Sequence, residues 1–219
     1  MTTVDKFRAA MRELPLIAIL RGITPAEAVP VGLALAEAGL RIVEVPLNSP
    51  QPLRSIEVLS RELGERCLVG AGTVMSAAQV DQVARAGGRL IVMPHGDAAV
   101  IRAAKAQSLW CAPGIATPGE GFAALAAGAD ALKLFPAELL IPPVVKALRA
   151  VFPPQVLFLP VGGITPQSMA AYAAAGASGF GLGSALYKPG LTVAQVKANA
   201  QAFVLAWRAV HASGPGEGA

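Results

Sequence analysis

Two charged residues stand alone inside apolar runs of this 219-residue chain. Lys133 lies in the run Ala131-Leu-Lys-Leu-Phe135, and Glu44 lies in the run Ile42-Val-Glu-Val-Pro46. Apolar runs of this length are typical of buried β-strands. Lysine and glutamate are almost never fully buried without a structural or chemical reason. These two residues are therefore the first candidates for chemistry.

Lys133 has the setting of an amine nucleophile. Side chains of a strand alternate between its faces, so the two leucines beside Lys133 would face outward and the lysine inward. Burial disfavours the ammonium form, by up to about 3–5 pKa units when desolvation is complete. A neutral amine of this kind forms a Schiff base with a ketone. A lysine that snorkels to the surface or forms a structural salt bridge is the alternative.

Glu44 has the properties of a general acid and base for the same reaction. Imine formation requires a proton for the water that leaves the carbinolamine, and cleavage of a C–C bond requires removal of a proton from a hydroxyl group. A carboxylate facing the amine can perform both transfers, directly or through one water. The alternative is a counter-ion that keeps Lys133 charged.

The spacing of four glycines indicates that the two charged residues meet. Four alanine-rich segments end in glycine, as expected where a helix ends before a strand, and the glycines are separated by 48, 41 and 48 residues. Alternate strands of a parallel barrel contribute one interior layer of four side chains. Five residues after each glycine stand Glu44, Val92, Lys133 and Gly181.

Eight β-prone runs alternate with helix-prone stretches along the chain. This alternation predicts an α/β fold, a single (β/α)8 TIM barrel with an extra N-terminal helix near Thr2–Leu14. The barrel domain would span residues 1–211, followed by a flexible C-terminal tail at 212–219. A doubly wound open sheet is the alternative. The runs are Leu16–Leu20, Ile42–Leu47, Cys67–Ala71, Leu90–Pro94, Leu109–Ala112, Ala131–Phe135, Val156–Val161 and Gly179–Gly183.

Several helices are expected to begin at a serine or threonine, often followed by proline. Such a residue can accept a bond from a free amide of the first turn, and proline at the first helical position loses no hydrogen bond. The last helix is expected at about Val193–Val210. The start signals are Thr24-Pro25, Ser49-Pro50, Ser76, Thr117-Pro118 and Thr165-Pro166.

Two glycine-rich strand ends predict an anion site. Val161-Gly-Gly-Ile164 follows the seventh run, and Gly181-Leu-Gly-Ser184 follows the eighth. Glycines let main-chain amides approach an anion, and the loops after strands 7 and 8 commonly bind phosphate in such barrels. We therefore expect phosphate contacts from Gly162, Gly163, Gly183 and Ser184.

Other strand ends supply further candidates for substrate binding. Arg21 can clamp a carboxylate or a phosphate, and Thr73 offers a hydroxyl group. Pro94 and Phe135 would form an apolar wall. His95 has no nucleophile or metal partner in the sequence and is interpreted as a loop residue.

Composition excludes several classes of protein. With 54% hydrophobic and 15% charged residues, the chain can bury a large core, and its apolar runs are too short to span a membrane. No signal peptide, nucleic-acid-binding run or metal-ligand cluster is evident, so we expect a cytoplasmic protein with no cofactor and no metal. The two cysteines, Cys67 and Cys111, are expected to be reduced and buried.

Taken together, these motifs resemble the KDPG/KHG aldolase family over about Pro15 to Arg208. The residues that carry the resemblance are Leu16-Ile-Ala-Ile-Leu-Arg-Gly-Ile-Thr-Pro25, Val43-Glu-Val-Pro-Leu-Asn-Ser-Pro-Gln51, Gly70-Ala-Gly-Thr-Val74, Lys133-Leu-Phe-Pro136 and Val161-Gly-Gly-Ile-Thr-Pro166.

The resemblance implies a homotrimeric, metal-independent class I aldolase. It assigns the Schiff base to Lys133 and proton transfer to Glu44. Arg21 and Thr73 would hold the keto-acid end, with Pro94 and Phe135 around the pyruvyl unit, and the substrate would be a phosphorylated 2-keto-3-deoxy sugar acid that yields pyruvate. The residues implied to hold the phosphate are Gly162, Gly163, Gly183 and Ser184.

Two departures from the family's gluconate-type pattern bear on the substrate. Asn48-Ser49 stands where that type has Arg-Thr, and Val161 stands where it has Thr. A missing hydroxyl beside the phosphate loop can separate epimers, because an unmet buried hydrogen bond is costly. We therefore expect a substrate-binding role for Val161 and cleavage of 2-dehydro-3-deoxy-6-phosphogalactonate to pyruvate and D-glyceraldehyde 3-phosphate. The alternatives are a gluconate-type aldolase, a phosphate-binding barrel isomerase or epimerase, and a non-catalytic sugar-phosphate-binding protein.

Overall fold

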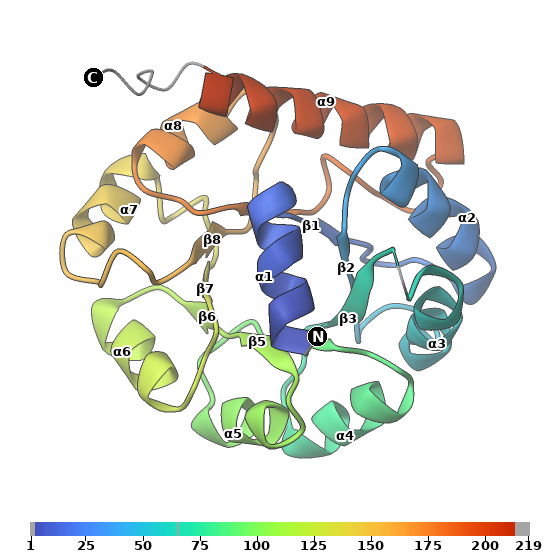
Figure 1. Ribbon diagram of the computed structural model, residues 1–219, viewed down its shortest axis with the longest axis horizontal. Helices are drawn as coiled ribbons and strands as arrows, with labels where there is room; N and C mark the ends of the chain where they lie inside the picture. Colours follow the sequence, from blue (N-terminus) through green and yellow to red (C-terminus); the bar gives the residue numbers. More distant parts are fainter. Residues whose placement is uncertain (1–2, 65, 213–219) are drawn as a thin grey trace.

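The computed structural model describes residues 3–64 and 66–212. Figure 1 shows helices α2 to α9 arranged around a central group of strands, with α1 lying across one end of that group. The helices are α1 (Thr3–Glu13), α2 (Pro25–Glu37), α3 (Pro52–Leu63), α4 (Ala77–Arg85), α5 (Ala98–Ala106), α6 (Pro118–Ala126), α7 (Pro142–Arg149), α8 (Met169–Ala174) and α9 (Val193–Ala212).

All eight runs predicted from the sequence contain strands. The strands are β1 (Leu16–Ile19), β2 (Ile42–Pro46), β3 (Leu68–Gly72), β4 (Leu90–Val92), β5 (Trp110–Ala112), β6 (Gly114–Ile115), β7 (Leu132–Leu134), β8 (Phe158–Pro160) and β9 (Phe180–Leu182).

The fifth run differs from the prediction, because it continues beyond Ala112 as β6. Pro113 separates β5 from β6. Proline has no amide hydrogen to donate to a neighbouring strand. Its carbonyl oxygen still accepts a 2.9 Å hydrogen bond from the amide of Lys133.

The strands pair in parallel, as an α/β fold of alternating strands and helices requires. They form a six-stranded sheet in the order β5-β4-β3-β2-β1-β9 and a three-stranded sheet in the order β6-β7-β8. A parallel bridge between Val161 and Gly181 connects the end of β8 with β9. The α/β class and the parallel arrangement predicted from the sequence are confirmed.

Side chains of the strands alternate between two buried regions, as the period of a strand dictates. On β7, Leu132 and Leu134 belong to the large core between strands and helices. The neighbouring Ala131, by contrast, belongs to a smaller core enclosed by the strands. On β2, Val43 belongs to the large core and Ile42 to the enclosed core. This alternation sends Lys133 and Glu44 to the enclosed side.

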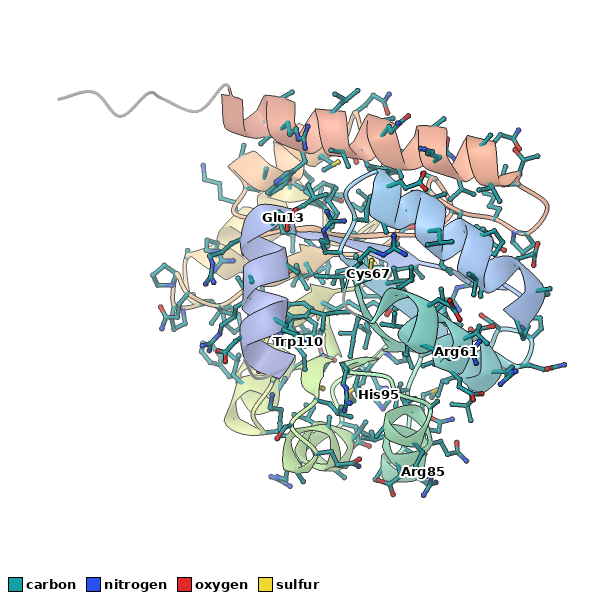
Figure 2. The ribbon with its side chains drawn as sticks, turned by 45° about the vertical axis from the view of Figure 1, so that its right-hand side comes forward. Glu13, Arg61, Cys67, Arg85, His95 and Trp110 are labelled. Carbon is teal, nitrogen blue, oxygen red and sulfur yellow. The ribbon has the colours of Figure 1, made fainter. Side chains whose placement is uncertain are left out.

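Helix α1 packs against the enclosed core at the amino ends of the strands. Its residues Phe7 and Met11 are buried in that core. The Phe7 ring stacks on Trp110 with ring centroids 3.5 Å apart and an interplanar angle of 20°. Figure 2 shows Trp110 beneath this helix. The interior is thereby covered at one end, so a substrate must enter from the carboxyl ends of the strands.

Three predicted helix starts are confirmed. Glu27 accepts a 3.1 Å hydrogen bond from the amide of Thr24 before α2, and Glu120 likewise accepts from Thr117 at 2.8 Å before α6. These are the reciprocal bonds of a capping box. Ser76 accepts a 3.3 Å bond from the amide of Gln79 at the start of α4.

Two predicted helix starts are wrong. Helix α3 begins at Pro52 after Gln51, and Ser49 instead accepts a 2.9 Å bond from the amide of Gly22. Helix α8 begins at Met169, because Thr165 and Ser168 bond to each other in a preceding turn. The Ser49 hydroxyl group thus bonds to a distant loop. Thr165 does accept a 3.3 Å bond from the amide of Ser168, as a helix start would, but the regular helix begins only at Met169.

The last helix, α9, extends to Ala212, two residues beyond the predicted end and into the first residue of the expected tail. The remainder of the predicted flexible tail, residues 213–219, lies outside the described residues. In the described part of the chain, no helix combines the length and apolarity that crossing a bilayer requires.

Candidate active site

Lys133 and Glu44 line the same small cavity in the enclosed side of the strands. The cavity leaves about 10 Å³ for the centre of a water molecule, which is room for about one water. Val92 and Gly181, the other members of the layer predicted from the glycine spacing, line it as well. The remaining lining residues are Ile17, Ile19, Ala112, Leu159 and Val161.

The environment of Lys133 favours a neutral amine. The residue is 5% exposed, and burial lowers the pKa of its ammonium group. Glu44 opposes this shift, whereas the nearby cation of Arg21 adds to it. The Nζ atom lies 4.5 Å from the centroid of the Phe135 ring, on the ring face. Contact with the aromatic face attracts the ammonium form and so offsets part of the effect of burial.

The environment of Glu44 favours a protonated carboxyl group. The residue is 2% exposed, and burial raises the pKa of its carboxyl group against the opposing effects of Lys133 and Arg21. Its Oε2 atom is buried and has no hydrogen-bond partner among the residues that the structure describes. A buried polar atom of this kind requires an explanation, and a ligand or a water in the cavity provides one.

Lys133 and Glu44 face each other without direct ionic contact. Within the described residues, no ion pair of 4.0 Å or less joins them, although each affects the pKa of the other. A structural counter-ion would lie against the ammonium group. The separation instead leaves space for a ligand or a water between the amine and the carboxyl group.

A larger cavity of about 470 Å³ opens above the inner one. Ile19 and Val161 line both cavities, so the two are continuous at these residues. Arg21 and Phe135 also line the larger cavity, which we call the mouth cavity. The four residues predicted to contact phosphate line this cavity too: Gly162, Gly163, Gly183 and Ser184.

The glycines after β8 have the conformation that the predicted anion site needs. Gly162 and Gly163 have φ angles of 117° and 61°, a region that residues with a side chain rarely adopt. Within the described residues, the amides of Gly163 and Ser184 donate to no acceptor, whereas Gly162 directly follows the bridge between Val161 and Gly181. Unpaired amides at a cavity wall can bind an anion.

Arg21 is held at the mouth cavity by the loop after β2. Its Nη1 atom donates a 2.7 Å hydrogen bond to Oδ1 of Asn48. The adjacent amide of Gly22 donates to Oγ of Ser49 at 2.9 Å. Asn48 and Ser49, which the sequence associates with substrate preference, therefore act on the position of the arginine loop.

Comparison with known proteins identifies the family. The family model described as KDPG and KHG aldolase matches residues 7–202. The chain belongs to the KDPG and KHG aldolase family. Its membership makes the protein an aldolase, a lyase of carbon–carbon bonds, and is consistent with a buried lysine facing a carboxyl group.

Two similar proteins and one similar solved structure carry the name of a single branch of this aldolase family. The 2-dehydro-3-deoxy-6-phosphogalactonate aldolase of Escherichia coli (strain K12) is 48% identical over 196 residues, which cover 90% of this chain and 96% of the relative. A probable aldolase of the same name from Rhizobium meliloti (strain 1021) is 47% identical over 208 residues, covering 95% and 98%. The solved structure called native KDPGal has a TM-score of 0.90 at 47% identity, covering 91% and 97%.

Two predicted binding residues of the aldolase lie outside both cavities. Thr73 and Pro94 follow β3 and β4, but neither lines the inner or the mouth cavity. Thr73 has a φ angle of 57°, and this left-handed conformation is an outlier for a β-branched residue. Such outliers often occur at functional sites.

Three polar residues of the mouth cavity were not predicted as site residues. Glu138, Tyr187 and Lys188 all line it. Tyr187 is 3% exposed and its hydroxyl group has no partner in the described protein. Glu138 follows the Lys133 strand, and Lys188 follows the Gly183–Ser184 loop. A charged residue soon after a strand end is therefore the signal that could have found two of the three.

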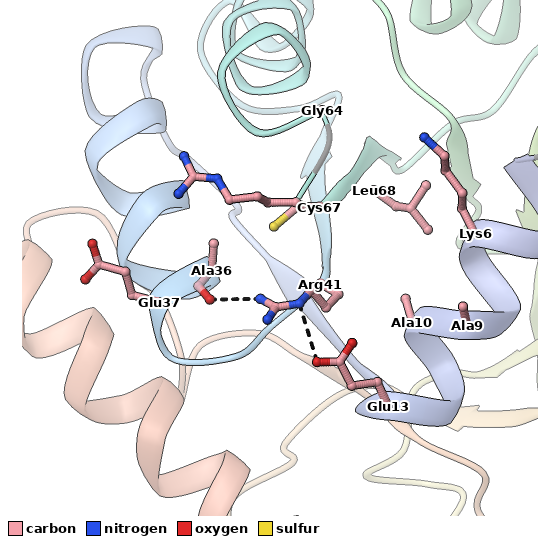
Figure 3. A pocket seen from close by; sticks show the side chains of 11 residues that line it. Lys6, Ala9, Ala10, Glu13, Ala36, Glu37, Arg41, Gly64, Cys67 and Leu68 are labelled. Atoms are coloured by element: carbon pink, nitrogen blue, oxygen red, sulfur yellow. Dashed lines mark hydrogen bonds and ion pairs between the residues drawn. The ribbon is translucent and has the colours of Figure 1, made fainter. Parts of the chain in front are cut away.

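A separate cavity of about 570 Å³ lies at the amino ends of the strands and includes Arg41 and Cys67 (Figure 3). Arg41 donates to the carbonyl oxygen of Ala36 at 2.9 Å and pairs with Glu13 at 3.6 Å. Burial raises the pKa of the Cys67 thiol to about 11, so it is a poor nucleophile at neutral pH. His95 is exposed in the loop after β4, as predicted.

Proposed function

We propose that this enzyme is a class I aldolase that cleaves 2-dehydro-3-deoxy-6-phosphogalactonate to pyruvate and D-glyceraldehyde 3-phosphate. The proposal is carried by one observation: a buried lysine and a buried carboxyl group line a one-water cavity directly below an open cavity with unpaired amides. Lys133 acts as the nucleophile and Glu44 as the acid–base group.

Imine formation uses the protonation states that burial favours. The neutral amine of Lys133 attacks C2 of the keto acid to form a carbinolamine. Protonated Glu44 then donates its proton to the carbinolamine hydroxyl, which leaves as water. The products are a protonated imine on Lys133 and an ionised Glu44. The positive imine now stabilises the carboxylate that burial alone disfavours.

Cleavage reverses the direction of proton transfer. The Glu44 carboxylate removes the proton from the C4 hydroxyl group, and the C3–C4 bond breaks as the aldehyde carbonyl forms. The electron pair of that bond moves into the imine and gives an enamine. Glu44 returns its proton to C3, and hydrolysis of the resulting imine releases pyruvate and restores both side chains.

Substrate binding follows from the position of the two cavities. The keto-acid end lies near Lys133, where Phe135 provides an apolar wall and Arg21 supplies a cation for the carboxylate. Thr73 and Pro94 are assigned to the same end by the family pattern. The phosphate lies at the other end of the mouth cavity, on the amides of Gly162, Gly163, Gly183 and Ser184.

The galactonate substrate is supported by the names of the similar aldolases and by Val161. This side chain is 8% exposed and lines both cavities, so it lies where the middle of an extended substrate passes. Valine offers no hydrogen bond there. A substrate epimer that depends on such a bond is bound less well.

Borohydride trapping tests the mechanism. Incubation with pyruvate and borohydride should add the mass of a reduced pyruvyl group to Lys133, located by peptide mass spectrometry. Lys133→Ala should lose turnover by at least about 1000-fold while remaining folded. An isomerase, an epimerase or a non-catalytic binding protein would give no adduct at Lys133. An unmodified Lys133 would therefore overturn the proposal.

The substrate itself is tested by pyruvate release from the two C4-epimeric phosphorylated acids under identical conditions. Faster release from the galactonate compound supports the assignment. Faster release from the gluconate compound would keep the roles of Lys133 and Glu44 but reject the assignment based on Val161.

We also infer that the two parallel sheets form one closed (β/α)8 barrel, with α1 as the extra N-terminal helix. Two junctions support this inference. Val161 and Gly181 bridge β8 to β9, and β5 and β6 are separated by Pro113 alone. Both halves of that interrupted strand contact the β7 region. The amide of Asp130, just before β7, donates to Cys111 of β5, and β6 pairs with β7 in parallel.

The active enzyme is proposed to be a cytoplasmic homotrimer. The trimer rests on the family resemblance, and light scattering should give a particle about three times the 22.3 kDa mass of the chain. A monomeric mass would reject it. The cytoplasmic location is supported by two free, buried cysteines, which fit a reducing compartment.

A further inference from the structure

Glu138 places a negative charge beside the loop that we propose binds phosphate. A Cβ atom on Gly163 would lie 3.1 Å from Cγ of Glu138, and one on Gly162 would collide with its Oε2 atom. Glu138 is an exposed residue that lines the mouth cavity. Its side chain therefore packs against both glycines at the wall of the mouth cavity.

The main chain fixes this position. The amide of Ala137 donates a 2.9 Å hydrogen bond to the carbonyl oxygen of Val161. The Tyr172 hydroxyl group on α8 donates to the carbonyl oxygen of Ala137 at 2.8 Å. Both polar groups of Ala137 are thus held, one of them by the residue directly before Gly162. Glu138 cannot move away from that turn without a rotation of its own side chain.

We propose that Glu138 limits the affinity for the phosphate group and thereby promotes release of the phosphorylated aldehyde. The inference rests on the proposed function, because it requires the phosphate to lie on Gly162 and Gly163. A bound phosphate either displaces the carboxylate or stays within a few ångströms of it. Both outcomes weaken binding, since like charges repel and displacement removes packing on the glycines.

Other charges around the mouth cavity have the opposite effect. Arg21 and Lys188 line the same cavity as Glu138 and attract a phosphate. Burial raises the pKa of the Tyr172 hydroxyl group, and the nearby charge of Glu138 adds to this shift. The site therefore combines cations that attract the substrate with one carboxylate that opposes tight binding. Glu138 sets the balance because it alone of these groups lies on the glycines.

The test compares inhibition by inorganic phosphate and by D-glyceraldehyde 3-phosphate in Glu138→Gln and the parent enzyme. Glutamine keeps the shape but removes the charge, so both inhibition constants should fall by about 3- to 10-fold, as expected for loss of one nearby like charge in a partly solvated site. The difference should shrink at high salt, because exposed charges are screened. The rate of borohydride trapping with pyruvate, which carries no phosphate, should stay within about twofold.

Two variants serve as controls. Glu138→Asp keeps the charge and should retain inhibition constants close to those of the parent enzyme. Glu57→Gln removes an exposed charge that pairs with Arg54 on α3, away from the mouth cavity, and should leave both constants unchanged.

The outcomes separate the role of Glu138 from the function itself. Unchanged or increased inhibition constants in Glu138→Gln, with normal trapping of pyruvate, would overturn the role of Glu138 alone. A parent enzyme that traps pyruvate but is inhibited by neither phosphate compound would reject the phosphate site and the role together. Failure of the parent enzyme to trap pyruvate would reject the proposed function.

Discussion

The carboxylate of Glu44 lies directly against the main chain of Gly72. A Cβ atom on Gly72 would be 2.7 Å from Cδ and from both carboxylate oxygens of Glu44. Real Cβ atoms essentially never come so close to other atoms. The glycine at the end of β3 is therefore required by space, and it determines where the Glu44 carboxyl group lies.

Gly72→Ala should displace the Glu44 carboxylate and lower kcat by about 10- to 100-fold, because small errors in the position of a catalytic group are costly. Trapping of pyruvate should also slow, since Glu44 assists formation of the imine. Steady-state kinetics and trapping rates measure both effects. Gly119→Ala is the matched control, because a Cβ atom there meets nothing within 4 Å. Equal activity of the two variants would contradict the role of Gly72.

Glu44→Gln should lose activity and gain stability. Its turnover should fall by about 100- to 10,000-fold without the acid–base group. Burial raises the folded-state pKa of Glu44 above the ordinary value of 4.5, so the ionisable residue costs folding free energy once the pH exceeds that ordinary value. Removing this cost should raise Tm at pH 7 by about 2–6 °C.

The stability gain of Glu44→Gln has a defined pH dependence. Below pH 4, the carboxyl group is protonated in both the folded and the unfolded chain, and the advantage of glutamine should disappear. Thermal unfolding at several pH values measures this. An advantage that is equal at low and neutral pH would show that the carboxyl group does not titrate as its burial implies.

Arg21→Gln should move the pH–rate profile to higher pH. The cation of Arg21 lowers the pKa of both Lys133 and Glu44, so its removal raises both. Lys133 then loses its proton at higher pH, and trapping of pyruvate at a fixed low pH becomes slower. Arg54→Gln, which removes an exposed cation paired with Glu57, should leave the profile in place. A shift to lower pH after loss of Arg21 would be incompatible with this electrostatic role.

Asn48→Ala should act through Arg21. Loss of the 2.7 Å bond frees the guanidinium group, and kcat/KM should fall by about 3- to 10-fold, as for other hydrogen bonds to a charged group at an exposed site. In the double variant with Arg21→Ala, the asparagine change should have little further effect. The double-mutant cycle of Asn48→Ala and Arg21→Ala should give a coupling free energy of about 1 kcal/mol. Additive effects would mean that Asn48 works independently of the arginine.

Val161→Thr should shift the preference between the two epimeric substrates. Val161 fills the space beside Gly181, where a Cβ atom on the glycine would be 2.5 Å from Cγ2 of the valine. Threonine has nearly the same shape, so packing is kept while a hydroxyl group is added. The ratio of kcat/KM for the gluconate over the galactonate compound should rise by about 10-fold. An unchanged ratio would assign the discrimination to other residues.

Local sequence patterns contain much of the fold and the centre of the site. The alternation of apolar runs with alanine-rich stretches predicts the strands and helices, because burial and backbone geometry impose periods of 2 and 3.6. The same alternation sends Lys133 to the interior, since its leucine neighbours must face the helices. Regular spacing of helix-ending glycines places Glu44 opposite it. These inferences need only neighbours along the chain or a repeated unit.

Contacts between distant loops were decided by the tertiary structure. Ser49 has the composition of a helix start, yet its hydroxyl group accepts from Gly22, which lies 27 residues earlier. The bond between Arg21 and Asn48 and the packing of Glu138 on Gly162 likewise join different strand ends. A local pattern contains no information about which loop will lie opposite, so none of these contacts was predicted.

The sequence by itself therefore determined an α/β chain with an inward lysine, an inward glutamate and two glycine-rich strand ends, because each follows from local periodicity. Only the tertiary structure decided how these groups are surrounded. It brought Gly72 beneath Glu44, Arg21 near both ionisable groups and Glu138 onto the glycine turn. Burial and charge act through space rather than along the chain, so the pKa of Lys133 and the composition of the mouth cavity depend on the folded arrangement.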